Sequence, residues 1–256
     1  MINNRLFVIP CYFDGSNDAI FNCTNSILKY YKNPSIVVID SNSPDKTYFR
    51  KLKSKSIEVI NSKNKNYEAG AYWIGFNKYN NFNNYYFIHD SIEFKKNLIN
   101  FERFEFSSFR YFYSHGGIRN VYRLKKRKNL LLKLKNIFKK DSEKTIFFKG
   151  FDNIQQYKWA VTELTKTTYF LPKIWLSLFG SMFICKNKVM RKLKEKNFNK
   201  ILPTNKNQSM SMERLFGIVL QQEGYDLSNS IQGDHFYSEM NTHNFKKKFL
   251  IEDNYT

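Results

Sequence analysis

The first ninety residues alternate short apolar runs with polar segments long enough to form helices. The apolar runs span residues 6–10, 35–40, 57–60 and 85–90. The segments between them that are compatible with helices span residues 18–31, 44–53 and about 68–79. Strands that are rich in Val and Ile and separated by helices are typical of a parallel sheet with right-handed crossovers and two covered faces. The pattern predicts an α/β fold with a mostly parallel central sheet and helices on both of its faces.

The second half of the chain is less regular. Residues 124–140, LKKRKNLLLKLKNIFKK, read as a basic helix with an apolar face. Such a helix can lie on an anionic membrane, or it can pack against the core of its own protein. A further helix is expected in SMERLFGIVLQQEGY, residues 211–225. With neither an internal repeat nor a low-complexity linker, the chain is predicted to form a single domain.

The composition narrows the choice of partners. Lys and Arg number 42 against 22 Asp and Glu, so the formal net charge is +20. This excess attracts polyanions such as nucleic acid, anionic lipid or phosphorylated substrates, although a genome rich in AT also encodes many lysines. An aromatic content of 18% would suit base stacking in a nucleic-acid-binding protein. The aromatic residues fall mostly within predicted strands and helices, however, where core packing explains them.

Several other classes and compartments find no support in the chain. P-loop, GxGxxG, HExxH and zinc-finger patterns are absent. The cysteines are three and widely spaced, which fits neither a disulfide framework nor a zinc site and favours a reducing compartment. The N-terminal apolar run is short and contains Pro10, unlike a signal peptide, and no apolar stretch reaches the roughly 20 residues of a membrane helix. We expect a cytoplasmic protein, with a peripheral position on the membrane surface as the alternative.

Polar side chains follow the ends of the predicted strands, where parallel sheets bind ligands. Asp40 ends the second apolar run. A carboxylate there can accept hydrogen bonds from a base or a ribose. It can equally form a turn that caps the next helix. Asp90 ends the fourth run. One carboxylate can hold a divalent cation that takes its other ligands from phosphate and water. The alternatives are a strand-end turn for Asp90 and a structural role for the adjacent His89.

Three other places carry candidate chemistry. Asn66 and Gly70 lie at the start of the third predicted helix, where a ligand can approach the backbone and a phosphate is favoured; packing of the helix on the sheet is the alternative. Glu213 lies near the beginning of its predicted helix. It could act as a base for an acceptor hydroxyl. The alternative is an exposed glutamate that stabilises the helix dipole. His235, in QGDHF, suits contact with a phosphate or a metal.

Taken in order, these motifs resemble the GT-A glycosyltransferases, especially the inverting family 2 and its relatives that build surface polysaccharides. VIPCYFDGSNDAIFNCTNSIL resembles their opening strand and helix, and VVIDSNSPDKT resembles the second strand with its nucleotide-binding aspartate. NSKNKNYEAGAYWIGF is similar to the segment before the third helix, and YYFIHDSIEF takes the place of the DxD motif. GSMFICKNKVMRKL resembles the strand on the acceptor side, and MERLFGIVLQQEGY resembles the helix that carries the catalytic base.

The resemblance implies a Rossmann-like GT-A fold over residues 1–256, with a nucleotide-binding half at about 1–95 and an acceptor-binding half at about 96–256. The side chains that it places at the donor are Pro10, Tyr12, Asp40, Asn66, Gly70, His89 and Asp90. It implies that Glu213 is the base of an inverting transfer and that Asp90 and His235 bind Mn²⁺ or Mg²⁺. The motif reads His89-Asp90-Ser91 and lacks a second aspartate, which leaves metal dependence open.

The implied partners are a nucleotide-sugar donor and a glycan or lipid-linked glycan acceptor. Contact with an anionic membrane through residues 124–140 is an additional possibility, and nucleic acid is not expected. Two other functions are alternatives to a transferase. One is a catalytically inactive GT-A-like binding subunit, which the incomplete DxD motif favours. The other is a basic nucleic-acid-binding protein.

Overall fold

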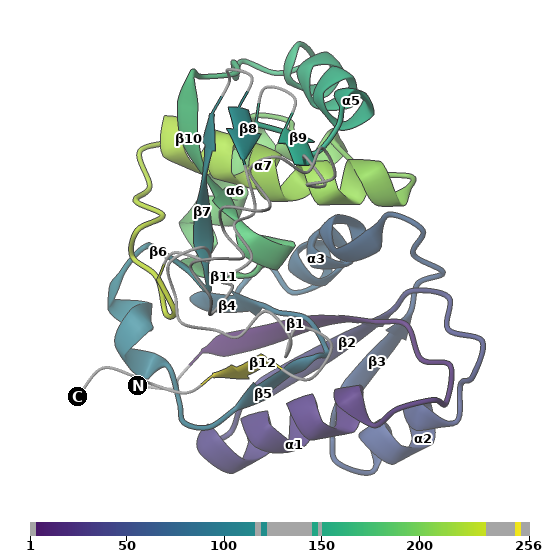
Figure 1. Ribbon diagram of the computed structural model, residues 1–256. Coiled ribbons are helices and arrows are strands. Elements are labelled where there is room, and N and C mark those ends of the chain that lie inside the picture. Colours follow the sequence, from purple (N-terminus) through teal and green to yellow (C-terminus); the bar gives the residue numbers. More distant parts are fainter. Residues whose placement is uncertain (1–3, 116–118, 122–144, 148–149, 234–248, 252–256) are drawn as a thin grey trace, which may run out of the picture.

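The computed structural model describes residues 4–115, 119–121, 145–147, 150–233 and 249–251. Its centre is a six-stranded sheet in the order β3-β2-β1-β4-β11-β6 (Figure 1). In that order the strands span Glu58–Asn61, Ser35–Asp40, Arg5–Cys11, Asn84–Phe87, Phe183–Lys186 and Phe106–Ser108. The first four are parallel, whereas β11 is antiparallel to both of its neighbours. The predicted α/β fold with a mostly parallel central sheet is confirmed.

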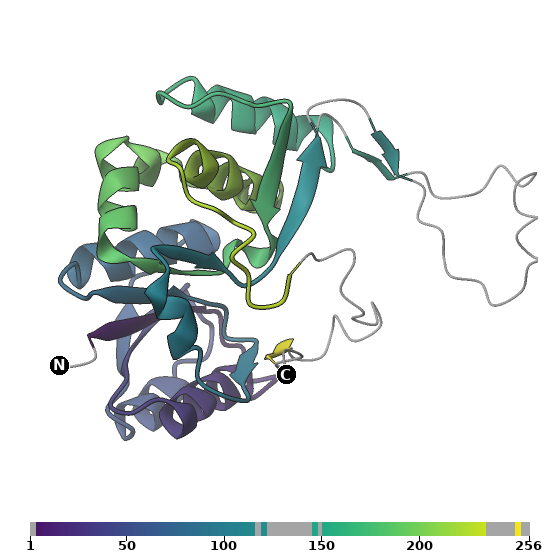
Figure 2. The same cartoon turned by 90° about the vertical axis from the view of Figure 1, so that its left-hand side faces the viewer.

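Helices cover both faces of this sheet. The helices α1 (Ala19–Tyr30) and α2 (Tyr48–Lys53) lie on one face, and α3 (Tyr67–Lys78) lies on the other (Figures 1 and 2). Alternate residues of β1 enter different cores: Phe7 and Ile9 join the core on the side of α1, whereas Leu6 and Val8 join the core on the side of α3. A strand buried on both faces must be apolar at successive positions, which explains the continuous apolar runs in the sequence.

The predicted elements of the first half all form, with shifted ends. The second helix was expected from residue 44 but begins at Tyr48, because the residues before it form a loop around the Asp40 side chain. The fourth strand was expected to reach residue 90 but ends at Phe87. Beyond it the chain turns into β5 (Ile92–Phe94), with the Ile92 amide donating a hydrogen bond to the carbonyl oxygen of His89 at 3.2 Å.

The second half builds a layer on the side of α3. In it, α7 (Lys206–Gln222) packs against β10 (Ile174–Leu178), which pairs antiparallel with β7 (Tyr111–His115), and α5 (Ile154–Leu164) packs on α7. The predicted segment GSMFICKNKVMRKL forms β11 and the helix α6. The remaining elements are η1 (Ile99–Arg103), β8 (Arg119–Val121), β9 (Thr145–Phe147), η2 (Phe179–Ser181), α6 (Asn187–Glu195), η3 (Phe198–Lys200) and β12 (Phe249–Ile251).

Two predictions from the sequence concern contact with membranes. The basic segment 124–140 lies outside the described residues, so membrane contact through it stays a prediction. Among the helices that are described, none combines the length and apolar content that crossing a membrane requires.

Gly217 marks the closest approach of α7 to β10. A Cβ atom at this position would overlap the carbonyl oxygen of Leu176 and lie 2.8 Å from the Cα of Ser177. Both are backbone atoms, so neither can move without shifting the strand. We expect Gly217→Ala to lower the free energy of unfolding by about 1–3 kcal/mol through overpacking, although Ala is the better helix former by about 1 kcal/mol. Urea unfolding measures this change.

The matched control is Lys206→Ala, at an exposed position in the first turn of the same helix. It should change the free energy of unfolding by less than about 0.5 kcal/mol. A Gly217→Ala protein as stable as this control would contradict the close approach of α7 to β10.

Candidate functional site

The predicted site residues from the first half lie near the carboxyl ends of β1, β2 and β4 or at the start of α3. Glu213 lies in α7, which contacts α3 and lies on the same side of the sheet (Figure 1). Two surface pockets of about 270 and 440 Å³ lie elsewhere, beside α1 and the segment from α2 to β3. Their linings contain none of the predicted site residues. The candidate site is therefore defined by its side-chain chemistry.

The carboxylate of Asp40 is fully buried and organises the loop that follows β2. Its Oδ1 accepts hydrogen bonds from the Ser43 amide at 3.2 Å and from the Tyr48 hydroxyl at 2.8 Å, and its Oδ2 pairs with Lys46. Burial favours the neutral acid, but these hydrogen bonds and the lysine charge outweigh it and lower the pKa of Asp40. The turn interpretation of Asp40 accounts for all of these contacts, and contact with the donor stays a prediction.

Asn66 and Gly70 lie at the start of α3, and both make close internal contacts. The Asn66 amide nitrogen Nδ2 donates a hydrogen bond to the carbonyl oxygen of Pro203 at 3.0 Å, which ties this helix end to the segment before α7. A Cβ atom on Gly70 would overlap Asn64 Oδ1 and lie 2.6 Å from the Cβ of Asn66. Gly70 is therefore needed for packing of the helix start, whatever ligand it also meets.

Asp90 and His89 lie in the turn after β4. Burial raises the pKa of Asp90, and this effect is opposed by the neighbouring His89 and by a hydrogen bond with Cys11 at the end of β1. Burial is also the first cause of the raised pKa of the Cys11 thiol, followed by the charge of Asp90. The turn thus places one carboxylate, partly shielded from water, at the junction of β1 and β4.

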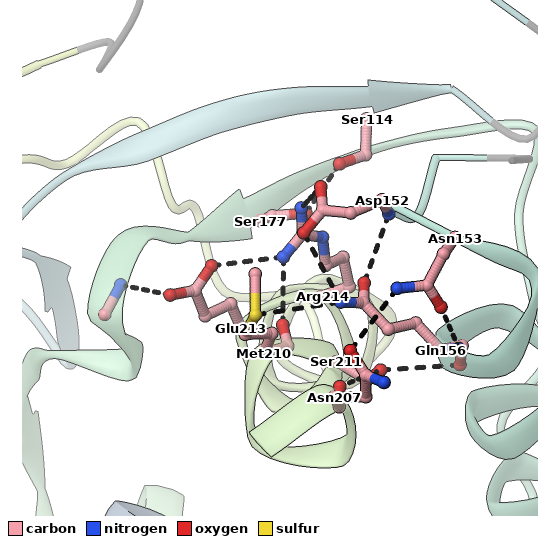
Figure 3. A network of polar contacts seen from close by, with 11 residues as sticks. Ser114, Asp152, Asn153, Gln156, Ser177, Asn207, Met210, Ser211, Glu213 and Arg214 are labelled. Atoms are coloured by element: carbon pink, nitrogen blue, oxygen red, sulfur yellow. Dashed lines mark hydrogen bonds and ion pairs between the residues drawn. The ribbon is translucent and has the colours of Figure 1, made fainter. Parts of the chain in front are cut away.

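Glu213 is held from both ends of its carboxylate. Oε1 accepts a hydrogen bond from the Gly180 amide at 3.0 Å, and Oε2 lies 3.2 Å from Nη1 of Arg214 (Figure 3). Burial raises the pKa of Glu213 to about 7; Arg214 and the Gly180 amide oppose the rise, whereas the charges of Glu68 and Asp152 add to it. The carboxylate is fixed in orientation and changes charge near neutral pH.

The position of Glu213 within its helix differs from the sequence prediction. The helix was expected to begin near residue 211, which would make Glu213 a first-turn residue facing the helix dipole. Instead α7 begins at Lys206, because Asn205 caps it by accepting a hydrogen bond from the Gln208 amide at 3.1 Å. Glu213 therefore lies about two turns inside the helix, and the interpretation as an exposed first-turn glutamate is wrong.

Arg214 connects Glu213 to α5. Its Nη2 lies 2.7 Å from Oδ1 of Asp152, just before α5, and its Nη1 donates to the carbonyl oxygen of Met210 at 2.9 Å (Figure 3). The guanidinium lies over the Phe112 ring, 5.0 Å from its centroid. Its side chain is 5% exposed. An arginine shared by two carboxylates orients both of them.

The remaining predicted residues are spread more widely. Pro10 lies in β1, and Tyr12 follows the strand with 62% of its surface exposed. His235 lies outside the described residues. Within the described part of the chain, no group of three or more His, Cys, Asp or Glu side chains is arranged to hold a metal ion. Among the predicted metal ligands, only Asp90 has a described position.

The residues that hold Glu213 and Arg214 in place were not predicted from the sequence. Gly180 lies in η2 with φ of +64°, a conformation that suits glycine and that directs its amide toward Glu213. The dipeptide Gly-Ser was a visible turn signal before β11, but its partner lies 33 residues away. Asp152 had no local pattern that would connect it with Arg214.

Comparison with known proteins adds no family assignment. No protein-family model matches the chain, and no curated protein matches its sequence. The evidence for function is therefore the chemistry of the side chains themselves.

Proposed function

We propose that the chain is an inverting glycosyltransferase with a GT-A fold. It would transfer a sugar from a nucleotide-sugar donor to a hydroxyl group of a glycan or lipid-linked glycan, with Glu213 as the base. The observation that carries the proposal is the state of Glu213: a carboxylate oriented by Gly180 and Arg214, with a pKa of about 7. A general base works best when its pKa lies near the working pH.

The chemistry follows from that carboxylate. Ionised Glu213 takes the proton of the acceptor hydroxyl, whose oxygen forms a bond with the anomeric carbon of the donor sugar. The bond from that carbon to the phosphate oxygen breaks, and the diphosphate leaves with the electron pair. Arg214 remains beside Glu213 through the reaction and keeps the carboxylate oriented. Attack from the side opposite the leaving group inverts the anomeric centre.

The end of β4 supports a donor site on the other side of the reacting carbon. Parallel sheets bind ligands beyond the carboxyl ends of their strands, and Asp90 lies in the turn that follows β4. One carboxylate fits Mn²⁺ or Mg²⁺ when phosphates and water complete the coordination. A divalent ion bound by Asp90 would offset the negative charge of the diphosphate.

The second candidate is a binding subunit that keeps the scaffold without transfer activity. It is favoured by the single aspartate in His89-Asp90-Ser91 and by the lack of a clustered metal-ligand set among the described residues. The nucleic-acid-binding alternative has weaker support, because most of the described aromatic side chains are buried in the two cores.

A thermal-shift screen tests the transferase. We expect one class among UDP-, GDP-, CMP- and dTDP-linked sugars to stabilise the protein, by about 2.7 kcal/mol at 100 times its Kd. Mn²⁺ should enlarge this shift in the wild type. Asp90→Asn should abolish the enlargement, because the amide no longer balances the charge of the ion.

The control for Asp90→Asn is Glu195→Gln, which removes one exposed carboxylate at the end of α6. It should keep the Mn²⁺ response. No shift with any nucleotide sugar would refute the proposal, and a strong shift with oligonucleotides in its place would favour the nucleic-acid-binding protein. A donor-dependent shift without sugar transfer or donor hydrolysis would favour the binding subunit.

A further inference from the structure

Besides Nε of Arg214, three buried polar atoms around the candidate site have no hydrogen-bond partner among the described residues. They are the hydroxyl of Tyr72 in α3, Nε2 of His89 after β4 and the hydroxyl of Ser181 at the end of η2. Tyr72 and Ser181 are fully buried as residues. A buried polar group without a partner costs about 1–3 kcal/mol. Such groups are rare in native proteins and call for an explanation.

Contacts and electrostatic interactions connect the three groups through their neighbours. The Tyr72 hydroxyl interacts electrostatically with Glu68 and with Asp90, the neighbour of His89. Cε1 of His89 lies 3.5 Å from the position of a Cβ built on Gly180, the residue before Ser181.

Glu213 closes this set of contacts. It accepts a hydrogen bond from the Gly180 amide, and its pKa responds to the charge of Glu68. Contacts and electrostatic interactions thus connect the unpartnered groups with the proposed donor carboxylate, Asp90, and with the proposed base, Glu213.

Backbone strain at Ser181 is an independent observation at the same place. Ser181 has φ of +53°, directly after Gly180 at +64°. A residue with a side chain rarely adopts this conformation, which costs of the order of 1 kcal/mol or more and is concentrated at functional sites. In this strained turn, the Gly180 amide donates a hydrogen bond to Glu213. The Ser181 hydroxyl is buried and has no partner among the described residues.

We propose that Tyr72, His89 and Ser181 form a subsite that binds hydroxyl groups of the transferred sugar and so selects the donor. The inference rests on the proposed transferase function. An imidazole, a phenol and an alcohol can each form a hydrogen bond with a sugar hydroxyl, because a hydroxyl both donates and accepts hydrogen bonds. The reacting sugar must lie between the departing phosphate and the base, and these groups have Asp90 and Glu213 among their neighbours.

The surrounding charges define the class of sugar further. Glu68, Asp90 and Glu213 accept hydrogen bonds from sugar hydroxyls when ionised, and they disfavour a second anion in the same place. Arg214 is already shared by Glu213 and Asp152. The subsite therefore suits a neutral hexose better than a uronic acid.

Two substitutions test the subsite by separating binding from stability. Tyr72→Phe and Ser181→Ala each remove an unpartnered hydroxyl, so neither should lower the free energy of unfolding of the ligand-free protein. Each should weaken binding of the nucleotide sugar about tenfold, because a sugar hydroxyl then loses its partner. Binding of the matching nucleotide diphosphate without sugar should stay within about twofold of the wild type.

The matched control is Tyr85→Phe in β4. The Tyr85 hydroxyl donates a hydrogen bond to the carbonyl oxygen of Tyr79 at 2.6 Å and accepts one from Asn187 at 3.1 Å, so it is satisfied within the protein. This variant should lose stability and keep the affinity for the nucleotide sugar, which is the reverse of the pattern expected for Tyr72→Phe.

Calorimetric titration with UDP-glucose, UDP-glucuronic acid, GDP-mannose, UDP and GDP separates the outcomes. If the wild type binds none of these ligands and responds to no nucleotide sugar in the thermal-shift screen, the proposed function and this inference both fail. If it binds a nucleotide sugar more tightly than the diphosphate and both variants keep that difference, only the subsite is overturned. A preference for UDP-glucuronic acid over UDP-glucose, or a marked loss of stability in Tyr72→Phe, would also overturn it.

Discussion

Glu213→Gln should lower the rate of sugar transfer by about 10²–10⁴-fold, the usual contribution of a positioned general base. The amide keeps the shape of the side chain, and its oxygen still accepts the hydrogen bond from Gly180. It cannot take the proton of the acceptor hydroxyl. Initial rates of transfer at saturating donor measure the loss, with the exposed Glu195→Gln as the control for removing one negative charge.

The pH dependence of the wild type follows from the same group. Since the pKa of Glu213 is about 7, the transfer rate should rise as the pH increases through 7 and the carboxylate ionises. Glu213→Gln should abolish this limb of the profile. Full turnover in this variant, or an unchanged rise near pH 7, would remove Glu213 from the mechanism.

The stability of the protein should show the opposite trend with pH. A raised pKa means that the folded state binds the proton more tightly than the unfolded chain, whose glutamate titrates near 4.5. The stabilisation is complete below pH 4.5 and is lost as the pH rises to about 7, by about 3 kcal/mol for this group. Above pH 7, Glu213→Gln should therefore unfold at a higher urea concentration than the wild type. In the wild type, the ionised carboxylate that activity needs lowers the stability of the folded state.

Glu102→Ala should lower the free energy of unfolding by about 3–5 kcal/mol, the largest effect expected from a single stability variant. Arg5 in β1 is 1% exposed and places Nε and Nη2 at 2.7 and 3.2 Å from the two carboxylate oxygens of Glu102. Tyr86 and Asn84 also donate to that carboxylate, at 2.8 and 3.2 Å. Without Glu102, a guanidinium stays buried with no countercharge.

A surface pair provides the matched control for Glu102→Ala. Glu105 pairs with Lys188, and both side chains are more than half exposed. Glu105→Ala should cost no more than about 1 kcal/mol. Urea unfolding compares the two variants. Equal losses would show that burial of the Arg5–Glu102 pair does not matter, and a donor-induced thermal shift that survives Glu102→Ala would separate this pair from the site.

The succession of strands and helices in the first half of the chain follows from the sequence alone. Apolar runs that alternate with helix-length segments reflect local burial on both faces of a sheet, so the pattern is visible without knowing the partners of each strand. The ends of β2 and β4, and with them Asp40 and Asp90, could be placed within a few residues for the same reason. Boundaries moved where side chains such as Asp40 organise a loop.

The assembly of the site was decided by the tertiary structure. The start of α7 at Lys206 and the fold of the chain bring Glu213 to the Gly180 amide, and β11 enters the sheet antiparallel between β4 and β6. Burial then sets the pKa of Glu213, and the hydroxyls of Tyr72 in α3 and Ser181 in η2 are buried without a hydrogen-bond partner among the described residues. Periodicity records which face of an element is buried. It carries no information on contacts between separate elements, such as Glu213 with Gly180 or Arg214 with Asp152, and the chemistry of this site depends on those contacts.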